Sequence, residues 1–319
     1  MTQAQPSRRA WGGDAARKAA AVAAVAAAQQ ADPDVFLYPV FILAEPGDAK
    51  GNSQLFCSAF GTADPAELEA RSGVDMVTLR VLCSVLPLLY TFEPGEGEDQ
   101  NQRRIPTPAS VDSAARALEA IPVGADLDQI PRHYLRTLLT DLTPGALLCG
   151  QALAPASEAA RLQVAALHAS GSTDAAAYRT ARRAAMSAAD SATSELDADV
   201  LKFVESVAWP TGSVVGELPE LAGTLHGELA DALGRECLTA EERRVLLAAG
   251  AKQKELVSEF QRNPALGYEW LDKVMKECPE VVAGVAPELI ARRQRAYNVT
   301  IEAYAPRAMA TLLRALSGR

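Results

Sequence analysis

The sequence is poor in the residues that metal sites and common catalytic sites need. It has three histidines in 319 residues, His133, His168 and His226, and none of them belongs to an HExxH or HxH pattern. A zinc site takes about four ligands, usually at short intervals along the chain. We therefore expect no bound metal.

Signatures of cofactor binding and of nucleophilic catalysis are also missing. The sequence contains no GxGxxG and no GxxxxGK[ST], and the one Gly-flanked loop with a lysine, residues 47–51, lacks the Ser or Thr that phosphate binding requires. A Cys149–His168 pair stays open, because catalytic partners meet in space and not in sequence. The expectation is a protein that binds no cofactor and is not an enzyme.

Cysteines are few, and long apolar runs are absent. The five cysteines are scattered, odd in number and never spaced as CxxC, which is typical of a reducing compartment and predicts a cytoplasmic protein. The most apolar run, residues 77–92, is interrupted by Arg80 and Pro87 and is too short to cross a bilayer. No membrane partner is expected.

Aromatic residues make up only 5% of the chain, while alanine accounts for 62 residues. Alanine loses no side-chain entropy in a helix, and its small side chain lets neighbouring helices approach closely. Coding bias in a GC-rich genome would produce the same excess. Together with the pattern below, the composition predicts a mainly α fold, a multi-helix globular bundle with a short β-hairpin near residues 35–60 and an N-terminal arm.

Start signals place most of the helices. Asp64-Pro65 and Asn263-Pro264 pair a capping residue with a proline at the first helical position, and Thr239 with Glu242 forms a capping box. A buried helix is expected over 75–92, where Pro87 should kink or end it. Further helices are predicted at residues 14–30, 110–121, 131–142, 156–169, 174–208, 217–236, 240–261, 264–277 and 287–317.

Loops and charge divide the chain into three expected parts. These are a basic, Ala-rich arm or helix over 1–30, a smaller subdomain over 31–105 with the hairpin and the buried helix, and a C-terminal helical domain over 106–319. The strands of the hairpin are predicted at 35–44 and 54–60. Whether they pair within one chain or between two chains stays open.

The net charge of −9 disfavours a nucleic-acid partner, but basic residues cluster at a few places. The clusters lie in the first 30 residues, on the helix predicted at 174–208 and on the last helix. Arginine binds phosphate oxygens through two parallel hydrogen bonds, and solvated helix faces with local ion pairs are the alternative. The candidate nucleic-acid-binding residues are Arg8, Arg9, Arg17, Lys18, Arg179, Arg182, Arg183, Arg292, Arg293 and Arg295.

The excess of Pro, Ala and Ser over the whole chain resembles the proline-alanine-serine-rich proteins of polymycoviruses, which are fungal double-stranded RNA viruses. The resemblance lies in composition and size and carries no motif, so no residue role follows from it. It implies a coat-like protein that associates with viral RNA in the host cytoplasm and forms homo-oligomers.

Three functions therefore remain as expectations. The first is an RNA-associated viral structural protein that self-associates without catalysis. The second is a helical protein–protein scaffold that binds no nucleic acid. The third is an enzyme with an unrecognised helical active site, which would need titratable groups of shifted pKa in a pocket.

Overall fold

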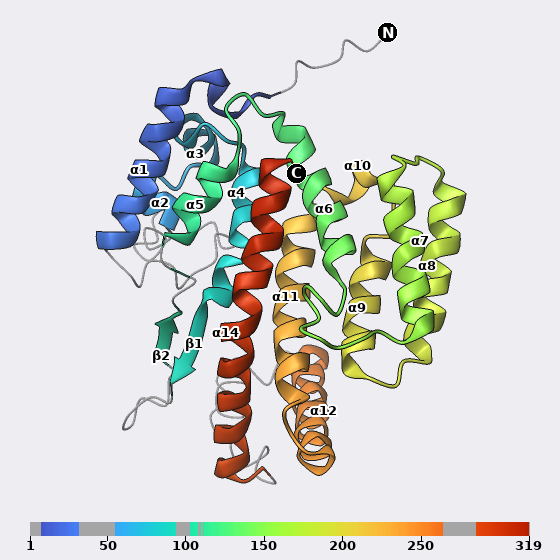
Figure 1. Ribbon diagram of the computed structural model, residues 1–319. Helices are drawn as coiled ribbons and strands as arrows, with labels where there is room; N and C mark the ends of the chain where they lie inside the picture. Colours follow the sequence, from blue (N-terminus) through green and yellow to red (C-terminus); the bar gives the residue numbers. More distant parts are fainter. Residues whose placement is uncertain are drawn as a thin grey trace. The chain divides into compact units, whose positions relative to one another are not determined.

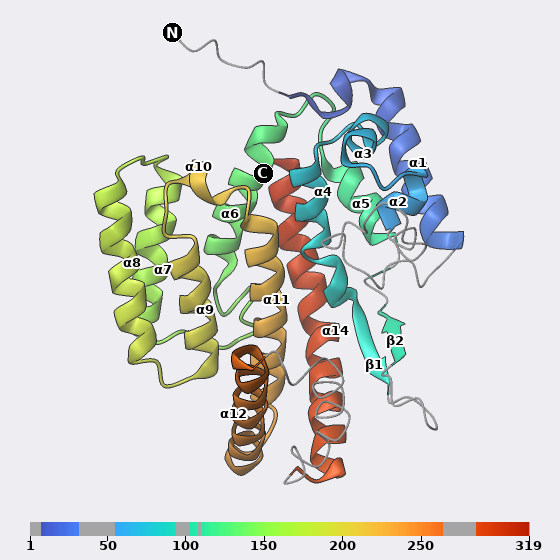
Figure 2. The same cartoon turned by 180° about the vertical axis from the view of Figure 1, so that it is seen from behind.

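The structure is a computed structural model that describes residues 8–31, 55–93, 103–107, 110, 112–263 and 285–318. It is mainly helical, as predicted, and Figures 1 and 2 show it from two opposite sides. The chain divides into two units, Met1–Ala230 with Ile301–Arg319, and Asp231–Thr300. The boundaries expected from sequence lie after residues 30 and 105, whereas in this division the last helix contributes its C-terminal half to the first unit.

The N-terminal segment from residue 8 onward is folded into the first unit and is not an arm. A short 3-10 helix, η1 (Ala10–Gly13), precedes α1 (Ala15–Ala31), and Asp14 accepts a hydrogen bond from the amide of Ala16 at 2.8 Å. Trp11 is 1% exposed. Removing so large an apolar side chain from water stabilises the folded state. The helix expected over residues 14–30 is therefore confirmed as α1, and residues 8–13 before it pack into the first unit.

The Trp11 backbone makes a close contact with a turn that requires glycine. The amide of Trp11 donates to the carbonyl of Gly73 at 2.6 Å, and Gly73 has a φ of +76°. A Cβ at Gly73 would lie 2.5 Å from Cδ1 of Trp11. Only glycine combines this left-handed backbone with so close an approach.

Three short helices follow in the same part of the first unit. They are α2 (Leu55–Phe60), α3 (Pro65–Ser72) and α4 (Met76–Cys83). Asp64 and Asp75 cap the last two, each accepting a hydrogen bond at 2.9 Å from the third amide of its helix. The predicted strand over residues 54–60 is wrong from residue 55 onward, because Leu55, Phe56 and Phe60 form a buried helical face.

The helix expected over residues 75–92 is shorter than predicted. It ends at Cys83, the 3-10 helix η4 (Leu86–Leu89) contains Pro87, and the chain then enters a strand. Proline lacks the amide that the helix would need, which is the physical reason for the early end.

The described sheet has two strands, β1 (Tyr90–Glu93) and β2 (Arg103–Pro106), paired antiparallel with Tyr90 opposite Pro106. The predicted strand over 35–44 lies outside the described residues. A hairpin therefore exists in the first unit, but the sequence prediction placed it elsewhere. In both views β1 lies beyond the C-terminal end of α4, after η4 (Figures 1 and 2).

A second group of helices begins with α5 (Ser113–Ala120) and α6 (Ile130–Asp141), which are separated by the 3-10 helix η6 (Leu127–Gln129). Helices α7 (Pro155–Ala169), α8 (Ala175–Asp190) and α9 (Glu195–Ser206) then lie side by side, followed by the short α10 (Thr211–Val214) (Figures 1 and 2). Buried alanines such as Ala160, Ala181 and Ala185 allow this close packing.

The single helix predicted over 174–208 is wrong, because the chain forms α8 and α9 there. Ser194 accepts a hydrogen bond from the amide of Asp197 at 3.1 Å, and its hydroxyl donates to the carboxylate of Asp197 at 2.6 Å. This is a new helix start. The polar run over 191–194 was the signal, and the alanine-rich pattern on its N-terminal side obscured it.

The last helices match the prediction closely. They are α11 (Leu218–Arg235), α12 (Ala240–Arg262) and α14 (Pro287–Ser317), and α14 continues through Pro306. The capping box is confirmed, with the amide of Thr239 donating to Glu242 at 2.8 Å and the amide of Glu242 donating to Thr239 at 3.3 Å. The helix predicted at 264–277 lies outside the described residues. No helix in the described ranges is long and apolar enough to span a membrane.

Candidate functional site

The N-terminal basic residues make their contacts within the first unit. Arg8 forms ion pairs with Asp75 at 3.0 Å and Asp128 at 3.5 Å, and Arg9 donates to the carbonyl of Gly124 at 3.2 Å. These contacts fasten the N-terminal segment to the loop that precedes α6. They use the same donors that a phosphate would need.

Arg17 and Lys18 on α1 are also occupied. Arg17 donates to the carbonyl of Ala70. The ammonium of Lys18 donates to the carbonyls of Glu119 at 2.6 Å and Ile121 at 2.7 Å, and it lies 5.1 Å from the ring centroid of Trp11. The cation therefore satisfies carbonyls at the end of α5 that the helix itself leaves unpaired.

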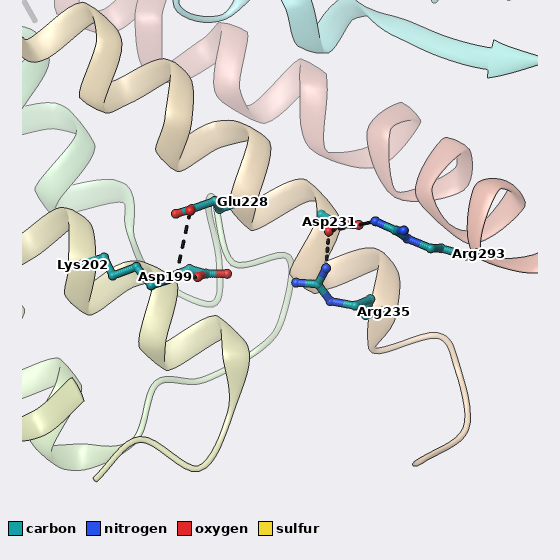
Figure 3. A network of polar contacts seen from close by, with 6 residues as sticks. All are labelled: Asp199, Lys202, Glu228, Asp231, Arg235 and Arg293. Carbon is teal, nitrogen blue, oxygen red and sulfur yellow. Dashed lines mark hydrogen bonds and ion pairs between the residues drawn. The ribbon is translucent and has the colours of Figure 1, made fainter. Parts of the chain in front are cut away.

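The third group of candidate cations, Arg292, Arg293 and Arg295, lies on the part of α14 that belongs to the second unit. Arg292 pairs with Glu242, and Arg293 donates to both carboxylate oxygens of Asp231 at 3.1 and 3.2 Å. Figure 3 shows Arg293 and Arg235 converging on Asp231, so this carboxylate is shared by two guanidinium groups. Arg295 is exposed and has no ion pair or hydrogen bond with any residue in the described ranges.

The first unit shows a similar pairing on α9. Lys202 lies 2.7 Å from Asp199 and 4.0 Å from Glu228 of α11 (Figure 3). Like Arg8 and Arg292, Lys202 is paired with acids of its own unit. Because acids outnumber bases by nine in this chain, many basic side chains can be paired with an acid in this way.

The surface of α8 differs from the other clusters. Arg179 and Arg183 are exposed one turn apart, and neither forms an ion pair or a hydrogen bond with another described residue. Arg182, between them in sequence, turns toward α9, where its guanidinium donates to Glu205 at 3.2 and 3.3 Å. It also lies over the ring of Trp209, 4.8 Å from the centroid.

Acids near this surface are few and largely engaged. Residues 155–190 contain three acids, Glu158, Asp174 and Asp190. Glu158 pairs with the buried Arg161, which holds the pKa of this carboxyl below its usual value, and Asp174 caps α8 by accepting from the amide of Ala176 at 2.8 Å. The positive charge of Arg179 and Arg183 is therefore not neutralised within the helix pair α7–α8.

A buried polar chain crosses the interior of the first unit. Tyr134 lies 2.9 Å from Ser84 Oγ and 3.1 Å from His226 Nε2, and His226 Nδ1 lies 2.7 Å from the hydroxyl of Tyr304. The four residues come from the C-terminal end of α4 and from α6, α11 and α14, and none is more than 1% exposed. Each polar atom has a partner, which is the condition for burying such groups without a large cost.

The hydrogen bonds of this chain have a single consistent direction. Ser84 donates to the carbonyl of Val81 at 2.7 Å, so it accepts from Tyr134, and Tyr134 must then accept from Nε2–H of His226. Nδ1 accepts from Tyr304. Burial in apolar surroundings lowers the pKa of His226 to about 3 and raises the pKa of both tyrosines. His226 is therefore neutral, and it links Tyr134 to Tyr304 by hydrogen bonds within the core.

His168 has a similar environment and is not paired with Cys149. Its Nε2 donates to the carbonyl of Val207 at 2.8 Å, and its Nδ1 lies 2.9 Å from the hydroxyl of Thr211 and 3.2 Å from that of Tyr178. Burial lowers the pKa of His168, and burial raises that of the Cys149 thiol. With both ring nitrogens engaged, His168 cannot act as the base that a Cys–His pair requires.

Among the described residues, no group of three or more His, Cys, Asp or Glu side chains could hold a metal ion. The strongest candidate for function is therefore the surface of Arg179, Arg182, Arg183 and Trp209, which we call the α8 surface. The sequence analysis identified its arginines, and Trp209 was not among the candidate residues. The available signal was the position of Trp209, between the end of one helix and Pro210.

Comparison with known proteins gives no relative from which a function could be transferred. No known family, curated protein or solved structure matches this chain.

Proposed function

We propose that the protein is a non-catalytic structural protein that associates with RNA through the α8 surface and self-associates in a coat-like manner. The observation that carries the proposal is the pair Arg179 and Arg183, two exposed arginines on one helix face that have no partner among the described residues. Guanidinium groups bind phosphate oxygens, and each neutralised phosphate releases counterions. The compositional resemblance to polymycovirus proteins supports the same function.

The proposal is narrower than the one based on sequence. Six of the candidate cations, Arg8, Arg17, Lys18, Arg182, Arg292 and Arg293, make ion pairs or carbonyl contacts inside their own unit, and Arg9 donates to Gly124. An RNA phosphate would have to compete with those acceptors. Arg179 and Arg183 face no such competition among the described residues.

The test is RNA binding by fluorescence anisotropy at several salt concentrations. The wild-type protein should bind a labelled RNA with an affinity that falls on a log–log plot against salt, and Arg179→Gln with Arg183→Gln should flatten that slope by about 1 to 2. The matched control is Arg244→Gln with Arg262→Gln, which removes two exposed charges from α12 and should leave the slope unchanged. Absence of RNA binding by the wild-type protein at low salt would reject the proposal.

A helical protein–protein scaffold is the second candidate, because the same helix pair exposes apolar side chains. Leu162 on α7 is 51% exposed and Met186 on α8 is 46% exposed. Methionine and arginine are enriched at protein interfaces. Under this alternative, sedimentation velocity would show an oligomer that dissociates on Leu162→Ser with Met186→Ser, and nuclease treatment would not affect it.

A further inference from the structure

Trp209 is unusual among the large aromatic residues of the first unit. Six of them, Trp11, Phe56, Tyr90, Tyr134, Tyr178 and Tyr304, are less than 2% exposed. Trp209 is 43% exposed, although burying an indole is among the most favourable contributions to folding. An exposed tryptophan in contact with an arginine of α8 calls for a functional explanation.

The indole of Trp209 is held in place and does not hang free in solvent. The backbone amide of Trp209 donates to the carbonyl of Val207 at 2.8 Å, and the next residue is Pro210. Arg182 lies over the ring at 4.8 Å, and Glu205 holds that guanidinium at 3.2 and 3.3 Å. The ring is therefore a fixed platform that is in contact with a cation and still presents a large area to solvent.

The charges that accompany this platform lie on the adjoining helix. Arg182 is three residues from Arg179 and next to Arg183, so one side chain links the platform to the two unpaired arginines. Arg179 and Arg183 are about 6 Å apart along the helix axis, from four residues at 1.5 Å each. A strand that crosses α8 could thus contact both cations while one of its bases reaches the indole.

We infer that the α8 surface takes single-stranded RNA, with an unpaired base stacked on Trp209 and the flanking phosphates bound by Arg179 and Arg183. This inference rests on the proposed function and names its substrate class. In a duplex both faces of each base are covered by neighbouring bases, so an indole can only stack on a base that is unpaired or at an end. Aromatic stacking next to a cationic track is the arrangement by which proteins bind single strands without reading sequence.

The experiment compares a labelled 12-nucleotide single strand with a duplex of the same sequence. The wild-type protein should bind the single strand more tightly, and Trp209→Leu should weaken that binding about 5- to 150-fold, from roughly 1–3 kcal/mol per stacked base. Duplex binding should change less than twofold. Trp209→Phe, which keeps a ring, should retain most of the affinity, whereas a merely structural role for Trp209 would not distinguish single strand from duplex.

The outcomes separate the inference from the proposed function. Equal affinity for the two RNAs, with Trp209→Leu neutral and Arg179→Gln with Arg183→Gln weakening both, would overturn the inference and leave RNA association standing. Failure to bind either RNA would overturn both. Circular dichroism of Trp209→Leu should match the wild-type protein, since Trp209 is 43% exposed and leucine keeps an apolar side chain at the covered part.

Discussion

The N-terminal segment and α8 carry similar basic residues and use them in opposite ways. Arg8, Arg17 and Lys18 are directed at carboxylates or carbonyls of the same unit, while Arg179 and Arg183 are directed at solvent. The difference lies in the acceptors that the fold brings near. Carbonyls at the ends of α3 and α5 lie beside α1. Near α8, three acids are already bound, Glu158 to Arg161, Asp174 to a helix amide and Glu205 to Arg182.

A cluster of arginines in a sequence therefore indicates only where hydrogen-bond donors lie. Its meaning depends on whether acceptors lie within about 3 Å, and exposed ion pairs contribute little to stability in either case. The basic residues of the N-terminal segment contact acceptors of their own unit. Those of α8 are available for a partner.

The largest expected effect tests the structural side of this comparison. Trp11→Ala should lower the free energy of unfolding by about 3–5 kcal/mol, because it removes a fully buried indole from between α1 and the Gly73 turn. Urea unfolding followed by circular dichroism measures it. Trp209→Ala is the matched control and should cost clearly less, since Trp209 is 43% exposed and Trp11 is 1% exposed. Equal losses for the two variants would mean that the N-terminal segment is not part of the core.

The next effect concerns the most enclosed polar group. The pKa of His226 is about 3 in the folded protein and about 6.5 when unfolded, so below pH 6.5 only the unfolded state gains the proton. Stability should therefore fall as the pH drops, by at most about 1.4 kcal/mol per unit and about 3 kcal/mol from pH 7 to pH 4. Above pH 7 this residue contributes no pH dependence.

Urea unfolding at each pH measures this slope. His226→Gln should flatten it, at a cost in stability at pH 7, because the amide can still donate and accept but fits the chain of hydroxyls less well. His168, whose pKa is also lowered by burial, leaves a residual slope. An unchanged slope in His226→Gln would contradict the assignment.

A smaller effect is expected at Lys18. Lys18→Met keeps the aliphatic stem near Trp11 but removes the donor to the carbonyls of Glu119 and Ile121, which should cost about 1–2 kcal/mol. Thermal unfolding would show it. Lys252→Met, at an exposed i,i+3 pair with Glu255, should be nearly neutral. If neither variant lowered the free energy of unfolding, water would be replacing the ammonium of Lys18 as the donor to the carbonyls at the end of α5.

The smallest effect is expected on α8. Arg179→Gln with Arg183→Gln should change the free energy of unfolding by no more than about 0.5 kcal/mol, because these side chains contact no described partner and glutamine is also a good helix former. Chemical unfolding of this variant beside Lys18→Met checks the prediction. A loss as large as that of Lys18→Met would show that the α8 arginines are also structural.

Much of the helical architecture was predictable from local signals. The starts of α3, α8, α12 and α14 are marked by a capping residue or by proline at the first helical position, and capping acts within four residues of chain. The division between α8 and α9 was missed because the alanine-rich pattern before residue 191 favours a continuous helix. The position of the hairpin was missed because residues 90–93 also fit the end of an apolar helix, and pairing with 103–106 decided the matter.

The candidate site was predictable in part for the same reason. Helix periodicity indicates that Arg179 and Arg183 share a face, but it cannot reveal whether an acid from another element lies opposite. Arg182 illustrates this, because its partner Glu205 is on α9 and its ring partner Trp209 follows that helix. The exposure of Trp209 depends on which neighbours cover it, and no window of sequence contains that information.

The sequence by itself determined that the chain is helical, where most helices begin, and which donors it offers, because these depend on side-chain entropy and on hydrogen bonds between near neighbours. Only the tertiary structure decided that Lys18 closes the end of α5, that His226 lies neutral between two tyrosines, and that Arg179 and Arg183 remain open. The physical reason is that burial and the pairing of charges depend on residues about 100 positions apart in the chain, and packing alone brings these together.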